Sequence, residues 1–235
     1  MTASLRAIAL ALLAALGSCT PPPEPAHAQY VIGYGSLMHD ASRERTAPHA
    51  DAARPVMVSG YQRGWYTRSR GPGPGTTYLG VVPDVASDLN AVMYKVDAME
   101  LAATDRREGA YSRTLVAPSA VKLLAAGEEP GANDQIWIYE VPAGEATLVD
   151  EEHPLAQSYV DVFVSGCLEQ EERYHLPDFA LRCVRTTYGW SGQWVNDRVY
   201  PRRAFVFEPR SSQIDKLLSA ELPDYWPHMR IEGGQ

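Results

Sequence analysis

Residues 31–38 have the sequence VIGYGSLM. Together with Tyr30, the apolar start of this segment predicts a short buried strand, and the glycines at positions 33 and 35 predict a tight turn directly after it. Such a turn presents backbone N–H groups that can bind a carboxylate or a phosphate. Two glycines after a strand, however, most often mark only a turn. The dinucleotide pattern G-x-G-x-x-G and the P-loop lysine are absent, and Ser36 lacks the G-x-S-x-G setting of a hydrolase nucleophile.

A second segment, residues 105–113, has the sequence DRREGAYSR. It completes an expected helix that starts at the N-cap Asp97, in a capping box with Glu100, and stops at Gly109. Glu108 therefore lies on the last helical turn, where the negative end of the helix dipole raises the pKa of its carboxyl group. A raised pKa suits a general base that works near neutral pH. A solvated, charged helix end is the alternative. The arginines that would lower this pKa, if they point at the carboxylate, are Arg106, Arg107 and Arg113.

The two segments together resemble the γ-glutamylcyclotransferase (AIG2-like) family, in which a strand ends in Tyr-Gly-Ser-Leu and a later helix ends in Glu-Gly-x-Tyr. The turn at residues 34–37 resembles the substrate loop of that family, and Glu108 lies where the family has its catalytic glutamate. Expected strands at 92–96 and 114–117, on either side of the glutamate helix, also fit. The resemblance covers roughly residues 30–165. It implies an α+β fold with a small mixed β-barrel flanked by helices.

Members of this family release the amine from a γ-glutamyl amide by closing the glutamyl group into 5-oxoproline. The resemblance implies that Glu108 takes a proton from the α-amino group of the substrate and passes a proton to the leaving amine. No metal, nucleotide or other cofactor is implied, because the nucleophile belongs to the substrate. The implied substrate-binding residues are Tyr34, Gly35, Ser36 and Leu37, whose backbone would hold the α-carboxylate, and the pocket tyrosines Tyr139 and Tyr159. For these two tyrosines, core packing is an equal alternative.

One domain is expected from residue 30 to residue 235, because no further break in composition and no internal repeat follows. Segments rich in Val, Ile and Tyr predict strands at 30–33, 56–60, 78–82, 91–96, 114–117 and 136–141. Helices are predicted at 97–109, from Pro154 to about residue 171, and from about Ser212 to Pro223. Because the strands outnumber the helices and their order is irregular, an α+β body with a strongly curved sheet is favoured over a regular parallel sheet.

The C-terminal part, from about residue 175, departs from the small family members. Residues 186–203 are dense in aromatic residues and arginine, so this extension would either wrap the barrel or cap the pocket and select the leaving amine. Cys167 lies on the apolar face of the helix that begins at Pro154. It is either a buried thiol or, in an oxidising compartment, the disulfide partner of Cys183.

The N-terminus predicts export. Arg6 is the only charged residue within 1–18, and it precedes the apolar run AIALALLAAL at residues 7–16, which is short for a transmembrane span. The run ends in Leu-Gly-Ser before Cys19, which resembles the lipobox of bacterial lipoproteins, in which the cysteine is lipidated. An ordinary signal peptide with a chance cysteine is the alternative. Residues 20–29 form a proline-rich tether in this interpretation. A lipid-anchored protein of the bacterial envelope, facing the periplasm or the exterior, is expected.

Composition and charge exclude several classes of protein. The 235 residues are 45% hydrophobic and 21% charged, which is ordinary for a globular protein. The formal charge of −8 argues against a nucleic-acid partner. The histidines form no zinc-binding pattern. The function that the family resemblance implies, and that we expect, is the intramolecular aminolysis of a γ-glutamyl amine or peptide. Two rivals remain: a domain that binds a γ-glutamyl or other anionic ligand without turnover, and an envelope scaffold that works through its aromatic extension.

Overall fold

The computed structural model describes residues 27–203 and 210–232. The expected signal segment 1–18, the lipidation site Cys19 and most of the proline-rich tether lie outside the described residues. Within the described part of the chain, no helix is both long and apolar enough to cross a membrane.

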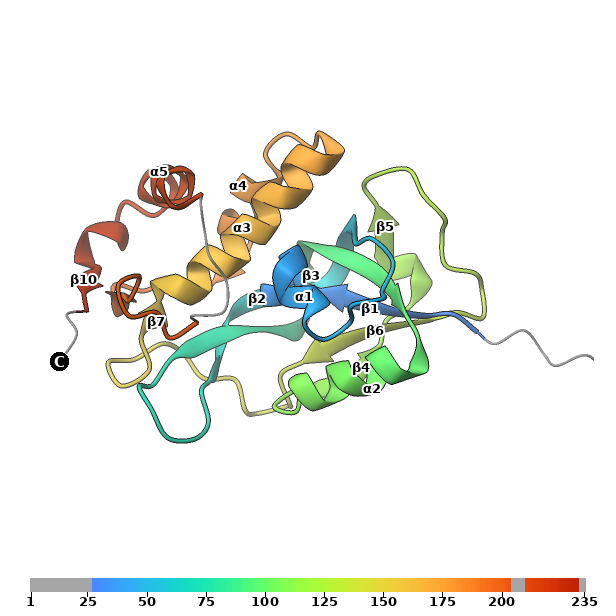
Figure 1. Cartoon of the computed structure of the whole chain (residues 1–235), viewed down its shortest axis with the longest axis horizontal. Coiled ribbons are helices and arrows are strands. Elements are labelled where there is room, and N and C mark those ends of the chain that lie inside the picture. Colours follow the sequence, from blue (N-terminus) through green and yellow to red (C-terminus); the bar gives the residue numbers. More distant parts are fainter. Residues whose placement is uncertain (1–26, 204–209, 233–235) are drawn as a thin grey trace, which may run out of the picture.

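A seven-stranded mixed sheet lies at the centre of the fold (Figure 1). Its strands follow the order β4 (Ser112–Leu115), β6 (Gln135–Glu140), β1 (Gln29–Gly33), β3 (Thr77–Val96), β2 (Arg54–Arg68) and β5 (Val121–Leu123), and β8 (Thr187–Tyr188) also pairs with β2. The pairs β1–β6 and β2–β8 are parallel, and the other pairs are antiparallel. The α+β fold with a mixed sheet flanked by helices is confirmed. The closed barrel is wrong, because the short edge strands β4 and β5 do not pair with each other.

Strand β1 shows how the sheet divides the core. Val31, which lies opposite Tyr94 of β3, is buried in the core cluster that also contains Phe163 of the long helix. Ile32, the next residue, is buried in a second cluster that contains Val56 and other strand residues. Successive side chains of a strand point to opposite faces, so the continuous apolar run before the turn reflects a strand that is buried on both sides.

The hairpin of β2 and β3 is much longer than the sequence predicts. The expected strands 78–82 and 91–96 are parts of one strand, β3, and the expected strand 56–60 is only part of β2. The polar residues between the two expected segments, including Pro83, resemble a break. Pro83 and Asp88 nevertheless pair with Tyr61 and Ser59 of β2 across a register shift, and residues 84–87 between them have no partner in that pairing.

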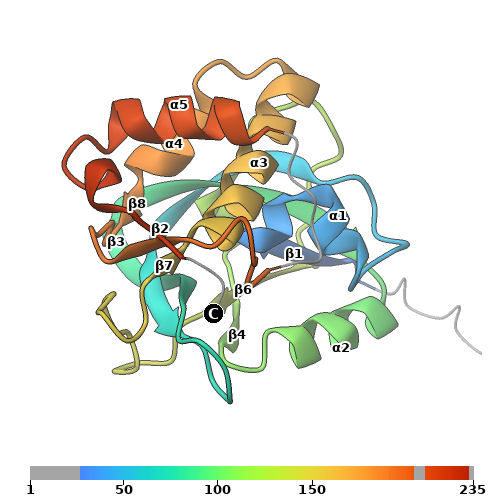
Figure 2. The ribbon, with the colours of Figure 1, turned by 60° about the vertical axis from the view of Figure 1, so that its left-hand side comes forward.

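The three predicted helices are present. They are α2 (Ala98–Arg107), α3 (Gln157–Tyr174) and α5 (Ser211–Glu221). The capping box of Asp97 and Glu100 is formed as expected. Helix α3 begins later than Pro154 because Leu155 and Ala156 form β7, which pairs with β9. Two short helices, α1 (Asp40–Glu44) and α4 (Phe179–Arg185), were not predicted. Figure 2 shows α3, α4 and α5 gathered together, with α2 apart from them.

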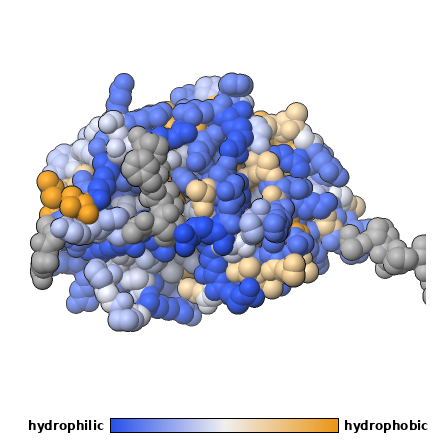
Figure 3. All heavy atoms as spheres, viewed as in Figure 1, coloured by the Kyte–Doolittle hydropathy of each residue, from blue (hydrophilic) through white to orange (hydrophobic). Residues whose placement is uncertain are grey.

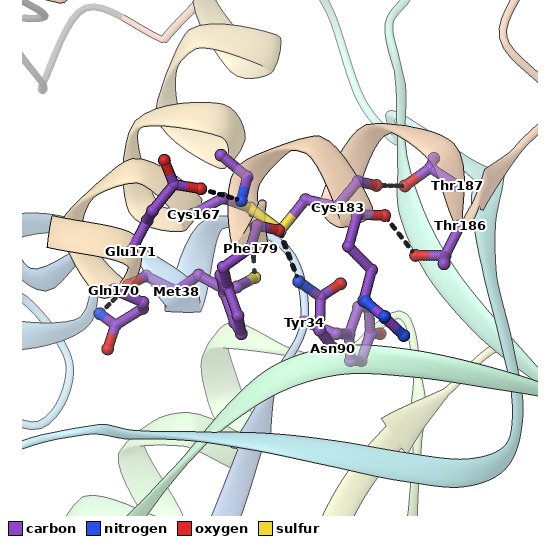
Figure 4. The surroundings of a disulfide bond; sticks show 12 residues. Tyr34, Met38, Asn90, Cys167, Gln170, Glu171, Phe179, Cys183, Thr186 and Thr187 are labelled. Atoms are coloured by element: carbon purple, nitrogen blue, oxygen red, sulfur yellow. Dashed lines mark hydrogen bonds between the residues drawn. A yellow bond between two sulfur atoms is a disulfide. The ribbon is translucent and has the colours of Figure 1, made fainter. Parts of the chain in front are cut away.

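A disulfide joins α3 to α4 (Figure 4). The Cα atoms of Cys167 and Cys183 are 6.6 Å apart, and both residues are fully buried. The paired alternative is therefore the one that the structure adopts. Asn90 of β3 donates hydrogen bonds to the carbonyl of Phe179 and to Sγ of Cys183, which fixes α4 against the sheet.

The C-terminal extension wraps the body of the domain. Its strands β9 (Trp194–Asn196) and β10 (Arg230–Ile231) form a small second sheet with β7 (Leu155–Ala156), which precedes the extension. Trp190 packs edge-on against Trp65 of β2 and stacks on Trp194, which contacts Trp226. These contacts bury aromatic surface of the tryptophans rather than expose it to solvent. On the face shown in Figure 3, the apolar side chains form small separate groups among polar ones.

Candidate active site

A cavity of about 440 Å³ opens beside the carboxyl end of α2. Its lining comes from the turn after β1, from α1, from the hairpin, from the end of α2, from α3 and from the C-terminal extension. The lining residues are Ser36, Ser42, Arg45, Thr46, Thr67, Arg68, Ser69, Arg70, Tyr78, Arg107, Glu108, Ala110, Tyr111, Tyr159 and Arg203. A small inner cavity of about 30 Å³ shares Ser36, Glu108, Tyr111 and Tyr159 with it, so the two form one site with a narrow inner end.

Glu108 lies where both cavities meet. It is the C-cap of α2, and its backbone N–H donates to the carbonyl of Thr104 at 2.8 Å. Its side chain is 15% exposed, and Arg107 Nε lies 3.2 Å from Oε1. Burial raises the pKa of the Glu108 carboxyl group, while Arg107 and Arg203 lower it. The raised direction agrees with the sequence prediction, but its largest cause is loss of solvent rather than the helix dipole.

Only one of the three suspected arginines contacts this carboxylate. Arg113 instead pairs with Asp105 at 2.7 Å and lies over the ring of Trp137. Arg106 is exposed. Arg107 has a second task, because its guanidinium donates to the Ser36 hydroxyl at 3.0 Å and thus ties the glycine turn to the end of α2.

The turn at residues 34–37 lies against α3. Gly35 precedes a single 3-10 turn (Ser36–Met38), and a Cβ on Gly35 would lie 3.2 Å from the hydroxyl of Tyr159. All four turn residues line the inner cavity. The sequence-predicted loop and the sequence-predicted glutamate are therefore brought together, although they are far apart in the chain.

The tyrosines of the site differ in what their hydroxyl groups do. Tyr34 donates to the backbone carbonyl of Tyr139, so its hydroxyl is used in the fold. The ring of Tyr139 lines the inner cavity, but its hydroxyl donates to Asp105 Oδ1 at 2.8 Å. Tyr159 lines both cavities, and burial raises the pKa of its hydroxyl group to about 12. Of the two expected pocket tyrosines, Tyr159 thus lines the whole site and Tyr139 only its inner end.

A buried arginine stabilises the turn at residues 34–37. Arg63 of β2 donates to the backbone carbonyls of Tyr34, Asn90 and Cys183, and to the hydroxyls of Thr186 and Thr187. Burial lowers the pKa of Arg63 to about 9, which leaves the side chain charged at neutral pH. The glycine turn is therefore linked to the same α4 that the disulfide holds.

Two further site residues had no assigned role in the sequence. Tyr111, the tyrosine of the Glu-Gly-x-Tyr pattern, lines both cavities and donates to the Leu79 carbonyl at 2.8 Å. Arg203 comes from the C-terminal extension, and its guanidinium lies over the rings of Tyr78 (4.5 Å) and Tyr159 (5.7 Å). The density of arginine in residues 186–203 was the signal for it. The extension therefore both wraps the domain and reaches the site.

The described residues contain no cluster of three His, Cys, Asp or Glu side chains that could hold a metal ion. The site instead combines one carboxylate with arginines, tyrosines and hydroxyl groups, which suits proton transfer and the binding of anionic groups.

Comparison with known proteins supports the fold. No protein-family model and no curated protein matches the chain. Among solved structures, the chain is similar to a gamma-glutamyl cyclotransferase, with a TM-score of 0.50 and 13% sequence identity over 68% of this chain and 88% of that one. It is equally similar to the uncharacterized protein loc79017 from Homo sapiens, with a TM-score of 0.50 and 14% identity over the same shares. At such identities the similarity shows the fold alone, which agrees with the α+β fold that the sequence resemblance implied, apart from the closed barrel.

Proposed function

We propose that this chain converts a γ-glutamyl amine or peptide into 5-oxoproline and the free amine. The α-amino nitrogen of the substrate attacks its own γ-carbonyl carbon, a new C–N bond closes the five-membered ring, and the original amide C–N bond breaks. The observation that carries the proposal is the position of Glu108, the one acidic side chain among the described residues that line the cavity, at the junction with the glycine turn.

Glu108 is the proton carrier in this proposal. An α-amino group has a pKa of about 8 and attacks only when neutral. The ionised Glu108 takes the proton from the attacking nitrogen, and the protonated carboxyl group gives it to the nitrogen of the leaving amine. Protons and bonds balance over the two steps, and no co-reactant is required. Burial favours the protonated carboxyl group, so the same shift that makes Glu108 a stronger base also eases the first transfer.

The remaining groups orient the substrate. Residues 34–37 line the inner cavity, and their backbone would hold the α-carboxylate, while Tyr111 and Tyr159 would enclose the glutamyl chain. Folding the substrate so that its amine lies against its γ-carbonyl is the main contribution that a protein can make to an intramolecular reaction.

The test uses the purified chain with a panel of γ-glutamyl amino acids and amines, and measures 5-oxoproline. Glu108→Gln removes the base but keeps the shape, and we expect the rate to fall by about 10²-fold or more. Glu128→Gln is the matched control, because Glu128 is exposed and does not line the cavity. Equal loss in both variants, or full activity of Glu108→Gln, would contradict the assignment. Binding of the panel without turnover would favour a ligand-binding domain.

We also propose that the domain works outside the cytoplasm, anchored through a lipid on Cys19. The signal-like segment before Cys19 supports export, and the buried Cys167–Cys183 disulfide suits an oxidising compartment. In a bacterial host, Cys19→Ala should move the protein from the membrane fraction to the soluble fraction. Unchanged fractionation would contradict the anchor.

A further inference from the structure

The residues that follow the glycine turn (residues 34–37) pack against the part of α3 that carries Cys167 (Figure 4). Cys167 Sγ lies 3.8 Å from Sδ of Met38, and Gln170 donates to the Met38 carbonyl at 3.4 Å. Gly166 approaches the next residue so closely that a Cβ at this position would lie 2.5 Å from the backbone nitrogen of His39. The far end of the glycine turn therefore depends on the position of α3 around its cysteine.

The start of the glycine turn is linked to the other cysteine through Arg63. The guanidinium of Arg63 donates to the carbonyl of Tyr34 at 3.3 Å and to the carbonyl of Cys183 at 2.9 Å. It also donates to the hydroxyls of Thr186 and Thr187, at 2.9 and 2.8 Å. Within the described residues, three of its six hydrogen bonds thus go to the end of α4 and the residues that follow it.

Arg63 depends on these acceptors because it is a buried cation. Its side chain is fully buried, and within the described part of the chain its hydrogen bonds go to neutral carbonyl, hydroxyl and amide oxygens. A buried charge that loses its hydrogen-bond partners is strongly destabilised. Arg63 therefore follows the end of α4 when that segment shifts, and the Tyr34 carbonyl loses its donor or moves with it.

Helix α4 depends on tertiary contacts for its position. It has only 7 residues, and its N-cap side chain makes no capping hydrogen bond. Besides packing, it is fixed by the disulfide to α3, by a hydrogen bond from Asn90 to Sγ of Cys183 at 3.3 Å, and by Glu171 of α3, which accepts from the Ala180 N–H at 2.8 Å. The disulfide is the covalent part of this attachment, so its loss leaves α4 held by weaker contacts alone.

We propose that the Cys167–Cys183 disulfide controls substrate binding, with Arg63 as the positioning residue that links it to the glycine turn. In the oxidised chain both ends of the turn are fixed, and its backbone holds the α-carboxylate of the substrate. In the reduced chain α4 shifts, and the turn loses that shape. The inference deepens the proposed function and rests on it for the identity of the ligand.

The redox step is a thiol–disulfide exchange. The two cysteine thiols and one low-molecular-weight disulfide give the protein disulfide and two small thiols, so two electrons and two protons pass from the protein to the oxidant. A dithiol reductant reverses the step. A chain that is made in a reducing compartment therefore gains its affinity for substrate only after it reaches an oxidising one.

The test compares the oxidised and the reduced full chain, with γ-glutamyl-alanine as the probe and 5-oxoproline release as the readout. We expect reduction to raise KM about tenfold, as for the loss of about one ligand-orienting hydrogen bond, and to change kcat by no more than about threefold. The base should stay in place because Glu108 caps α2 and not α4. Circular dichroism reports whether the reduced chain is folded.

Two variants separate this effect from other consequences of reduction. The Cys167→Ala/Cys183→Ala variant should have the raised KM with and without reductant, and because it keeps Cys19, an effect that came from Cys19 would persist in it. Val56→Ala is the control for a general loss of stability, because Val56 is fully buried in a core cluster that contains no residue of α4. Its KM should equal that of the wild type, and an equal rise in KM would overturn the inference. If the double variant does not fold, the two redox forms of the wild type carry the comparison.

Hydrogen exchange followed by mass spectrometry examines the turn without turnover. Reduction should speed the exchange of the backbone amides of residues 35–38 and leave those of α2 unchanged. Unchanged exchange at the turn or an unchanged KM would overturn the inference. An unfolded reduced chain would also overturn it, because the bond would then hold the whole domain. If exchange at the turn rises but neither form releases 5-oxoproline, the proposed function fails and the link between the disulfide and the turn remains.

Discussion

The Cys167–Cys183 disulfide should contribute a large part of the stability of this domain. The two cysteines are 16 residues apart in the chain. In the chain-entropy model, closing a loop of that length in the unfolded state stabilises the folded state by about 3 kcal/mol. A domain of this size has a total stability of about 5–15 kcal/mol, so loss of the bond is expected to lower the melting temperature by about 6–12 °C.

The surroundings of the bond indicate which part of the domain loses stability. Helix α4 has only 7 residues, which is too short to be stable alone. Its carbonyl groups at Phe179 and Cys183 accept hydrogen bonds from Asn90 and Arg63. Reduction should therefore loosen α4 and, through Arg63, the carbonyl of Tyr34 in the glycine turn.

The assay compares urea unfolding of the oxidised chain, the reduced chain and the Cys167→Ala/Cys183→Ala double variant. The reduced chain should unfold at a lower midpoint with a similar slope. Mass spectrometry of an unreduced digest identifies the linked peptide and separates this pair from Cys19. A linked pair with unchanged unfolding on reduction would refute the loop-entropy argument, and two free thiols in the oxidised chain would refute the bond itself.

Two other predictions concern stability near the site. Burial raises the pKa of Glu108 above its ordinary value of 4.5, so the folded state binds a proton at this carboxyl group more tightly than the unfolded state. Ionised Glu108 therefore destabilises the folded state at pH 7, and this destabilisation disappears below about pH 4.5. Glu108→Gln should therefore melt above the wild type at pH 7 but not at pH 4, and a variant that melts lower at pH 7 would contradict the dominance of burial. Gly166→Ala should destabilise the domain by about 1–3 kcal/mol and lower kcat/KM, because its Cβ would lie 2.5 Å from the backbone nitrogen of His39, just after the turn. Exposed Ser219→Ala in α5 is the control, and an unchanged midpoint for Gly166→Ala would refute the close approach of α3 to the turn.

The sequence predicts the local elements of this fold better than their extent. The capping box at Asp97 and the apolar run before Gly33 are local signals, and both predict the observed structure. The full length of β3 is a tertiary effect, because the residues on both sides of its polar middle pair with β2, whereas residues 84–87 lie at the register shift without a partner. Closure of a barrel depends on whether the edge strands β4 and β5 pair with each other. No local sequence pattern predicts such a pairing.

In the candidate site, too, local sequence patterns predict some residues, and tertiary contacts determine the others. Residues 34–37 and Glu108 stand out because each has a recognisable pattern, and the fold brings them to one cavity. Arg107 was expected to affect only the pKa of Glu108, whereas its hydrogen bond to Ser36 also holds the turn. The position of Arg203 depends on Ser158 and Asp197, which come from distant segments. Contacts of this kind leave no periodic or spaced signal in a single sequence.

Arg203 links the extension to the chemistry of Glu108. Burial raises the pKa of Glu108, while Arg107 and Arg203 lower it. The C-terminal extension therefore does more than enclose the pocket, because its Arg203 lowers the pKa of the carboxyl group that the proposed reaction uses as its base.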